Sequence, residues 1–301
     1  MSKKSVLTIV TDQILSVLES GVIPWQKPWV GCGGVHRNFV RKSRYSGINT
    51  FILAVSAWER KFSTPWWLTV NDAKKLGGRI KKESWSSPTC VVFYRERWFH
   101  SELNLWAKAD EVKAAPVMRE RGYEQRLILR YYKVYNLDQC EGIDPPQVEE
   151  PVGEGFSPIE KAETILSEMP DPPSFQYEGY RAFYSPKRDL ISVPTKESFR
   201  SEDSFYATVF HELIHSTGHE KRLSREAIAS VSHYASDSYS KEELTAEMGS
   251  AMLCLEAGIT PDWQNSASYV DSWLKALQAD RQWLLYGAAK AQAAVDTILV
   301  H

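Results

Sequence analysis

The stretch that decides the fold is His211-Glu212-Leu213-Ile214-His215, an H-E-x-x-H motif. On a helix, residues four apart share a face, so the two imidazoles lie together beside a carboxylate. Ser201 is a suitable N-cap for this helix, and Gly218 stands where a left-handed residue often ends one. The alternative, two ordinary surface histidines, requires the motif to arise by chance. The pattern is typical of a zinc peptidase site.

A peptidase metal site needs a third protein ligand and keeps a fourth position for water. In the metzincin pattern H-E-x-x-H-x-x-G-x-x-H a third histidine follows, but this chain has Lys221 there, which excludes that completion. His219 lies only four residues past His215, so its use would require the chain to fold back sharply. We expect His219 to be solvated, and the third ligand must come from further along the chain.

A second helical stretch, residues 240–255, carries Glu243 and Glu247 one turn apart. It resembles the gluzincin arrangement, in which a second helix supplies a ligand Glu and, four residues later, an acid that hydrogen-bonds a ligand histidine. The resemblance implies that Glu243 completes the metal site with His211 and His215, and that Glu247 supports a histidine. Two alternatives stay open: Glu247 is the ligand, or both acids face solvent.

The chemistry expected of this site follows from charge. Zn²⁺, or another divalent metal, held by two neutral imidazoles and a carboxylate lowers the pKa of bound water toward neutrality. Glu212 projects about 100° around the helix from His211 and is the expected catalytic base, which passes the proton to the leaving amine. Residues 183–193 predict a hairpin whose edge strand, by similarity to zincins, would align a peptide substrate.

The net charge of −2 hides an uneven distribution along the chain. Residues 1–145 carry 23 Lys and Arg against 14 Asp and Glu, a balance of +9, whereas residues 146–301 carry 13 against 24, a balance of −11. A segment rich in Pro, Gly and acid separates the two parts. We therefore expect two domains, residues 1–145 and 158–301, joined by a linker at 146–157.

Two absences bound the cellular setting. No apolar run reaches the roughly 18 residues of a membrane span, and the first residues do not resemble a signal peptide. The four cysteines form no C-x-x-C pair, which favours free thiols over a disulfide frame or a zinc finger. We expect a soluble cytoplasmic protein without a membrane partner.

The basic part of the chain is also rich in aromatic residues. It holds eight of the eleven tryptophans, more than one small core usually buries. Basic and aromatic residues interleave over residues 36–45, and further lysines and an arginine follow over residues 74–82. Cations contact phosphates while flat rings stack on unpaired bases, so this composition favours single-stranded nucleic acid. The alternative is that the tryptophans are core residues and the lysines a solvated face.

Several separated motifs resemble those of the ArdC-type antirestriction proteins of conjugative plasmids and related plasmid primases. They lie at residues 18–21, 24–29, 45–49, 67–70, 76–78 and 135–139, and in the second half at 211–222, 242–247 and 269–274. The resemblance covers nearly the whole chain. It implies an N-terminal single-stranded-DNA-binding domain, a C-terminal zincin-like metallopeptidase domain, and protection of incoming plasmid DNA from host restriction.

The family motifs also imply which residues meet DNA. We expect DNA contacts from Trp25, Trp29, Arg41, Lys42, Arg44 and Tyr45. The protein substrate is unidentified, and the host restriction system is one candidate. Two other functions stay open: a DNA-binding protein whose metal site is structural or regulatory, and a DNA-dependent protease that clears DNA-bound proteins.

The periodicity predicts an α+β fold in two domains. The first is expected to be α+β, with helices over residues 5–20, 47–61 and 70–77, strands near 89–96 and 127–136, and an excursion over 100–125. The second is expected to be mainly helical with a small sheet: a helix over 158–168, the hairpin, the motif helix, the glutamate helix and two helices over 266–300.

Overall fold

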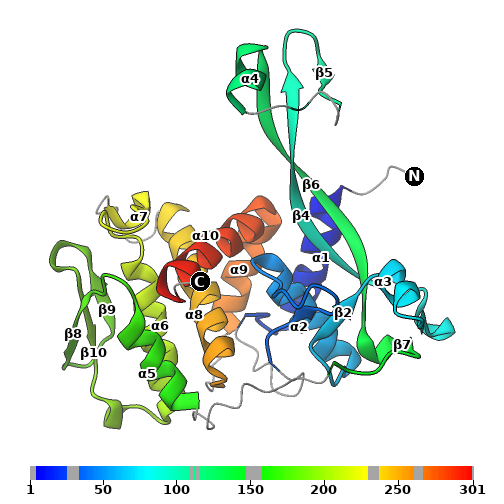
Figure 1. The fold of residues 1–301 in the computed structure, drawn as a ribbon. Helices are drawn as coiled ribbons and strands as arrows, with labels where there is room; N and C mark the ends of the chain where they lie inside the picture. The colour runs from blue at the N-terminus through cyan, green and yellow to red at the C-terminus, as the bar shows by residue number, and fades with distance from the viewer. Residues whose placement is uncertain are drawn as a thin grey trace.

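A computed structural model describes residues 5–25, 34–108, 112, 115–146, 158–229, 237–260 and 267–299. An N-terminal part is built around a five-stranded sheet, and a mainly helical C-terminal part carries a three-stranded sheet (Figure 1). The expected α+β class is confirmed. The expected linker lies outside the described residues apart from Pro146, so the domain boundaries stay a prediction.

The N-terminal part combines short helices with two sheets. Its elements are α1 (Val6–Glu19), β1 (Arg37–Asn38), α2 (Ile48–Arg60), β2 (Trp66–Leu68), α3 (Val70–Lys75), β3 (Arg79–Ile80), β4 (Thr89–His100), β5 (Leu105–Trp106), α4 (Ala115–Glu120), β6 (Tyr123–Asn136) and β7 (Cys140–Glu141). The large sheet has the order β1-β2-β6-β4-β5, and β3 pairs with β7. Local chemistry sets the helix starts: Ser5 caps α1, and Thr69 forms a capping box with Asp72 in α3. The three expected helices are confirmed.

Strands β4 and β6 form a long antiparallel ribbon. Their pairing runs from Thr89 opposite Val134 to His100 opposite Tyr123. Figure 1 shows the ribbon rising away from the rest of the molecule, with β5 and α4 at its far end. That end has a small core made of Trp98, Ala107 and Met118. The expected strands stopped at residue 96 and began at residue 127, because residues 97–100 and 123–126 lack a regular alternation of apolar and polar side chains.

The C-terminal part places helices around a small sheet. Its elements are α5 (Pro158–Glu168), β8 (Ser174–Tyr177), β9 (Phe183–Ser185), β10 (Leu190–Val193), α6 (Glu202–Ser216), α7 (Glu226–Ala229), α8 (Asp237–Ala257), α9 (Ala267–Ala279) and α10 (Gln282–Leu299). The antiparallel pair β9 and β10 is the expected hairpin, and β9 is an edge strand in the order β8-β10-β9. Strand β8, parallel to β10, was not predicted.

Gly249 lets the two helices that carry the site, α6 and α8, approach closely. A Cβ added at Gly249 of α8 would lie 2.6 Å from Cδ1 of Ile214 in α6. The expected left-handed cap at Gly218 is wrong: Thr217 caps α6 in a right-handed conformation, and Gly218 has no positive φ. Position 218 favours glycine for a steric reason, because a Cβ there would lie 2.7 Å from Cγ1 of Ile228 in α7.

One hydrophobic core runs through both parts of the molecule. It joins residues of α1 and α2, such as Ile14 and Phe51, to residues of α6 and α8, such as Phe210 and Leu244. Trp25 belongs to this core and is 1% exposed. Its ring makes edge contacts with Phe51 of α2 and Trp273 of α9. The basic and acidic halves of the sequence therefore fold against each other.

Two further expectations can be compared with the structure. Within the described residues, no helix is long and apolar enough to cross a membrane. Cys90, Cys140 and Cys254 are free thiols, as expected, and Cys32 lies outside the described residues.

Candidate metal centre and nucleic-acid interface

Helix α6 places both motif histidines on one face. The helix begins where expected, with the hydroxyl of Ser201 accepting a hydrogen bond from the backbone N–H of Ser204. One turn of helix separates His211 from His215, and their Nε2 atoms lie 3.1 Å apart. The two ring nitrogens therefore converge on one point.

Glu243 reaches the same point from α8. Its Oε2 lies 3.6 Å from Nε2 of His211, and its Oε1 lies 3.4 Å from Nε2 of His215. One donor atom from each of the three residues can be chosen so that all lie within 4.8 Å of one another. Two ligand atoms on a tetrahedral zinc are separated by roughly 3.3 Å, given bonds of about 2.0–2.1 Å. The spacing and the donor types therefore fit a divalent metal.

The same cluster carries strong electrostatic coupling. Burial disfavours the charged form of His215, but hydrogen bonds with Glu242 and Glu243 outweigh burial and raise its pKa to about 10. For Glu243, burial acts to raise the pKa, but hydrogen bonds with His211 and His215 hold it far below the usual range of a carboxyl group. Glu243 is therefore an anion, which is the form that binds a metal.

A buried acid behind His215 was missed by the sequence analysis. Oε1 of Glu242 lies 3.2 Å from Nδ1 of His215 and also accepts a hydrogen bond from Arg225. Because an ionised carboxylate only accepts, Nδ1 of His215 is the donor and Nε2 is left for the metal. The adjacent acids Glu242-Glu243 were the available signal. The role expected for Glu247 behind a histidine stays a prediction.

Glu212 directly follows His211 on α6 and is a mostly buried residue. Its side chain is 8% exposed. Within the described part of the chain, it forms no hydrogen bond or ion pair. Its carboxylate oxygens are not among the fully buried polar atoms that lack a partner, so the acid group keeps contact with solvent. Its position next to His211 leaves it free to act on a molecule bound at the metal.

The residues expected to contact DNA have different positions. Trp25 is a correction: it lies in the core between α2 and α9, so its ring has no face left for a base. Trp29 lies outside the described residues. Lys42 is exposed, with its ammonium 4.5 Å from the centre of the Phe39 ring.

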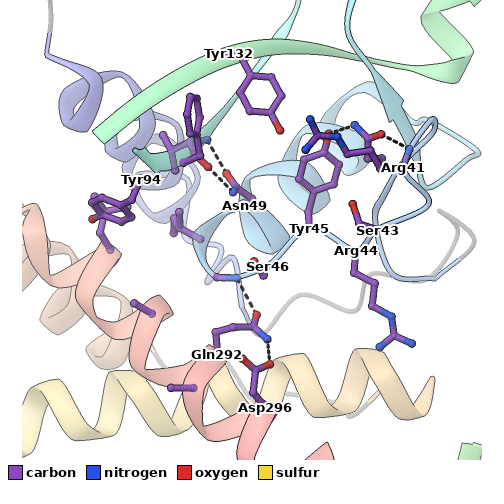
Figure 2. A pocket seen from close by; sticks show the side chains of 18 residues that line it. Arg41, Ser43, Arg44, Tyr45, Ser46, Asn49, Tyr94, Tyr132, Gln292 and Asp296 are labelled. Atoms are coloured by element: carbon purple, nitrogen blue, oxygen red, sulfur yellow. Dashed lines mark hydrogen bonds between the residues drawn. The ribbon is translucent and has the colours of Figure 1, made fainter. Parts of the chain in front are cut away.

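Arg41, Arg44 and Tyr45 follow β1 and line a cavity of about 530 Å³. Tyr45 is a second correction, because its side chain is only 9% exposed and packs in a core with Leu53 and Trp67, so its ring has no free face for stacking on a base. Figure 2 shows this cavity between the segment that follows β1, strand β4 and helix α10. Sequence reasoning missed its other lining residues, which include Phe93, Tyr94, Tyr132 and Gln292. The doubled aromatics at 93–94 and 131–132 were a usable signal, because adjacent residues in a strand point to opposite faces and one ring of each pair must lie outside.

The fold and the site define a protein whose C-terminal part is a zincin-like metallopeptidase domain. Residues 160–291 match the model of the zincin-like metallopeptidase family, and residues 4–137 match that of the N-terminal domain of the anti-restriction factor ArdC. The chain belongs to the ArdC-type antirestriction family.

Solved structures agree with this assignment. The chain is similar to the antirestriction ArdC protein from plasmid R388 in its metal-free form, with 30% identity, a TM-score of 0.75, and coverage of 98% of this chain and 97% of that one. The Mn(II)-bound form of the same protein gives a TM-score of 0.73 at the same identity and coverage.

Curated relatives include longer proteins. A DNA primase TraC of Escherichia coli is 34% identical over 96% of this chain, and a second TraC is 33% identical over 99%. The chain spans only 26% and 20% of their lengths. The uncharacterized protein y4eC of Sinorhizobium fredii is 28% identical, with 95% of this chain and 89% of that protein covered.

Proposed function

We propose that this chain is an antirestriction protein that binds single-stranded DNA with its N-terminal part and hydrolyses peptide bonds at a metal centre in its C-terminal part. Its biological effect is to protect incoming plasmid DNA from host restriction. The observation that carries the peptidase half of the proposal is the cluster of His211, His215 and Glu243, with Glu212 next to His211 in sequence and without a hydrogen bond or ion pair in the described part of the chain.

The residues divide the chemistry between them. His211, His215 and Glu243 hold the metal, and Glu242 keeps His215 in the tautomer that offers Nε2. When bound, the metal supplies Lewis acidity that makes water a nucleophile near neutral pH. Glu212 accepts the proton of the attacking water and delivers it to the departing amine. Zinc is our first choice of metal, and the Mn(II)-bound relative supports a divalent ion in general.

The DNA half of the proposal is supported by charge and exposed rings. The balance of +9 over residues 1–145 gives this part a favourable potential for phosphates. Arg41 is exposed and lines the same cavity as the exposed rings of Phe93 and Tyr94, and Lys42 is exposed next to it in sequence. Cations and flat rings on one surface suit an unpaired strand.

The decisive variant is Glu212→Gln. It should fold, bind metal and bind DNA, but hydrolyse protein substrates roughly 10²- to 10⁴-fold more slowly, because only the base is lost. Glu220→Gln is the matched control, since it makes the same change on an exposed glutamate just beyond the helix. Both should be compared in plasmid transfer into a restricting recipient. Full protection by the Glu212→Gln protein would show that DNA binding alone performs the antirestriction.

The partner of the peptidase is tested separately. Proteolysis should be measured with and without single-stranded oligonucleotide, against restriction subunits and against unrelated DNA-bound proteins. Cleavage confined to restriction subunits supports the proposal. Cleavage of any DNA-bound protein, only when DNA is added, would instead identify a DNA-dependent protease.

A further inference from the structure

The cavity in Figure 2 lies between the two parts of the molecule. One wall is the turn that leads into α2, and the facing wall is helix α10. The backbone N–H of Gly47 donates to Oε1 of Gln292 at 2.8 Å, and Nε2 of Gln292 donates to Oδ1 of Asp296 at 2.8 Å. Its volume of about 530 Å³ is that of a site for a molecule the size of a nucleotide.

Exposed aromatic rings form the side of this cavity that belongs to the ribbon. Phe93 is 41% exposed and Tyr94 is 53% exposed. The ring of Phe93 also meets that of Tyr132, with 5.6 Å between their centres. Flat rings left partly uncovered in a concave site offer stacking surfaces to a planar ligand.

The backbone edge of β4 adds hydrogen-bonding groups. The side-chain amide of Asn49 bonds both the N–H and the C=O of Val92, each at 2.8 Å. Val92 therefore directs both groups away from β6. In an antiparallel pair this direction repeats every second residue, so Tyr94 directs its N–H and C=O to the same side. A donor and an acceptor at this spacing are what the edge of a nucleobase requires.

The cavity also has a cation for a phosphate. In the described part of the chain, the guanidinium of Arg41 forms no ion pair or hydrogen bond. Arg44 is held differently, by Glu256 of α8 at 2.6 Å. Arg41 is therefore the side chain that is available to an anion.

A second hollow of about 640 Å³ continues from the first. The two share Asn38, Arg41, Phe93 and Tyr132, and the second is also lined by Lys75 and Tyr131. Arg41 lines both hollows, and the second hollow adds a cation, Lys75, and an aromatic ring, Tyr131. A chain of nucleotides can follow this path with alternating phosphate and base contacts.

We propose that the cavity between β4 and α10 receives one unstacked nucleotide of the DNA strand, with its base against Tyr94 and its phosphate at Arg41. The assignment rests on the proposed binding of single-stranded DNA and names the place where it occurs. It also makes α10, a helix of the peptidase part, a component of the DNA site.

The test uses the full chain and a fluorescein-labelled oligothymidylate, with affinity measured by anisotropy. Tyr94→Ala should weaken binding roughly 5- to 100-fold, as expected for loss of one base-stacking contact. The matched control is Tyr286→Ala, a tyrosine 50% exposed on α10 that does not line the cavity. Arg41→Ala should weaken binding and lower the slope of log affinity against log salt by about 0.7.

Changes in the DNA test the same contacts from the side of the ligand. Strands in which the bases are replaced by abasic residues should bind wild type more weakly, and Tyr94→Ala should distinguish them from normal strands less than wild type does. Thymidine monophosphate should compete only at concentrations far above those of the strand. Competition at equal concentration would overturn the strand assignment in favour of a free nucleotide.

Failures of the two proposals are distinguishable. A wild-type chain without affinity for any single strand refutes the proposed function. A wild-type chain that binds tightly, while Tyr94→Ala and Gln292→Ala bind equally well, refutes only the cavity.

Discussion

Arg225 holds Glu242 through two hydrogen bonds, from Nε to Oε2 at 2.9 Å and from Nη2 to Oε1 at 2.6 Å. The same guanidinium donates to the hydroxyl of Thr217 and to the carbonyl of Ile214 at the end of α6. Burial acts against the charge of Glu242, yet His215 and Arg225 keep its pKa below the usual value. This arginine therefore fixes the acid that orients His215.

Removing Arg225 should damage both stability and metal binding. Arg225→Ala leaves Glu242 as a buried charge with half of its partners, so we expect the free energy of unfolding to fall by about 3–5 kcal/mol. Metal affinity should fall about 10- to 100-fold, because a ligand histidine loses its support. Urea unfolding and calorimetric metal titration measure the two effects.

The control for that variant is Arg79→Ala. The pair of Arg79 with Glu141 is mostly exposed, with the arginine side chain 78% accessible, so its loss should cost less than about 1 kcal/mol. Equal effects of the two substitutions would show that Arg225 has no special role.

His36 should make the protein sensitive to acid. Burial lowers the pKa of His36 to about 4, and its Nδ1 accepts a hydrogen bond from Nε1 of Trp67 at 3.1 Å. The unfolded chain takes up this proton near pH 6.5, and the folded chain only near pH 4. The contribution of His36 to the free energy of unfolding is therefore complete above pH 6.5. It is lost as the pH falls toward 4, by about 3 kcal/mol in total.

Urea midpoints between pH 7 and pH 4 measure the effect. His36→Gln, which keeps an acceptor but does not titrate, should flatten the curve. A wild-type curve that is flat over this range contradicts the prediction.

Metal binding should release a proton. In the metal-free protein, His215 is a cation at neutral pH because its pKa is raised to about 10. The ion pairs of protonated His215 stabilise the metal-free fold. This stabilisation is complete below pH 6.5, the pKa of the histidine in the unfolded chain, and is lost as the pH rises through 10. A metal needs the neutral ring, so binding at pH 7 should release about one proton, and affinity should rise with pH. Titration calorimetry in two buffers of different ionisation enthalpy counts the protons released.

The third ligand can be decided by paired substitutions on α8. Glu243→Ala should abolish tight binding of one divalent ion per chain, because Glu243 supplies the only carboxylate of the three-residue cluster found among the described residues. Glu247→Ala should bind metal with a smaller loss. The reverse order of affinities would make Glu247 the ligand, and elemental analysis of the purified protein identifies the metal.

The sequence was informative where contacts are local or repeat a family pattern. The spacing of His211 and His215 places them on a common face of a helix, so two of the three residues of the metal cluster could be predicted from a single segment. Glu243 followed from a resemblance of the second helix. Arg225 was not predictable, because its partners lie on α6 and α8 and no periodic pattern records which buried arginine meets which acid.

The other differences between prediction and structure concern the direction of a side chain and contacts between residues far apart in the sequence. Trp25 belongs to a family motif, but a motif does not record that its ring enters a core shared with Trp273. The cavity joins Gly47 to Gln292, residues separated by 245 positions in sequence. Only the tertiary fold brings those two segments together, so the cavity had no signature in either of them.

Helix α8 carries Glu243 in its first half and Glu256 near its end, about 20 Å apart along the axis at 1.5 Å per residue. Glu256 meets Arg44 at the cavity, and Glu243 meets the histidines. Helix α8 therefore contributes a residue to the metal site and another to the contact at the cavity. If a bound strand shifts α8 and changes metal affinity by some factor, thermodynamic reciprocity requires the metal to change the affinity for the strand by the same factor. Each ligand then acts as the other's effector.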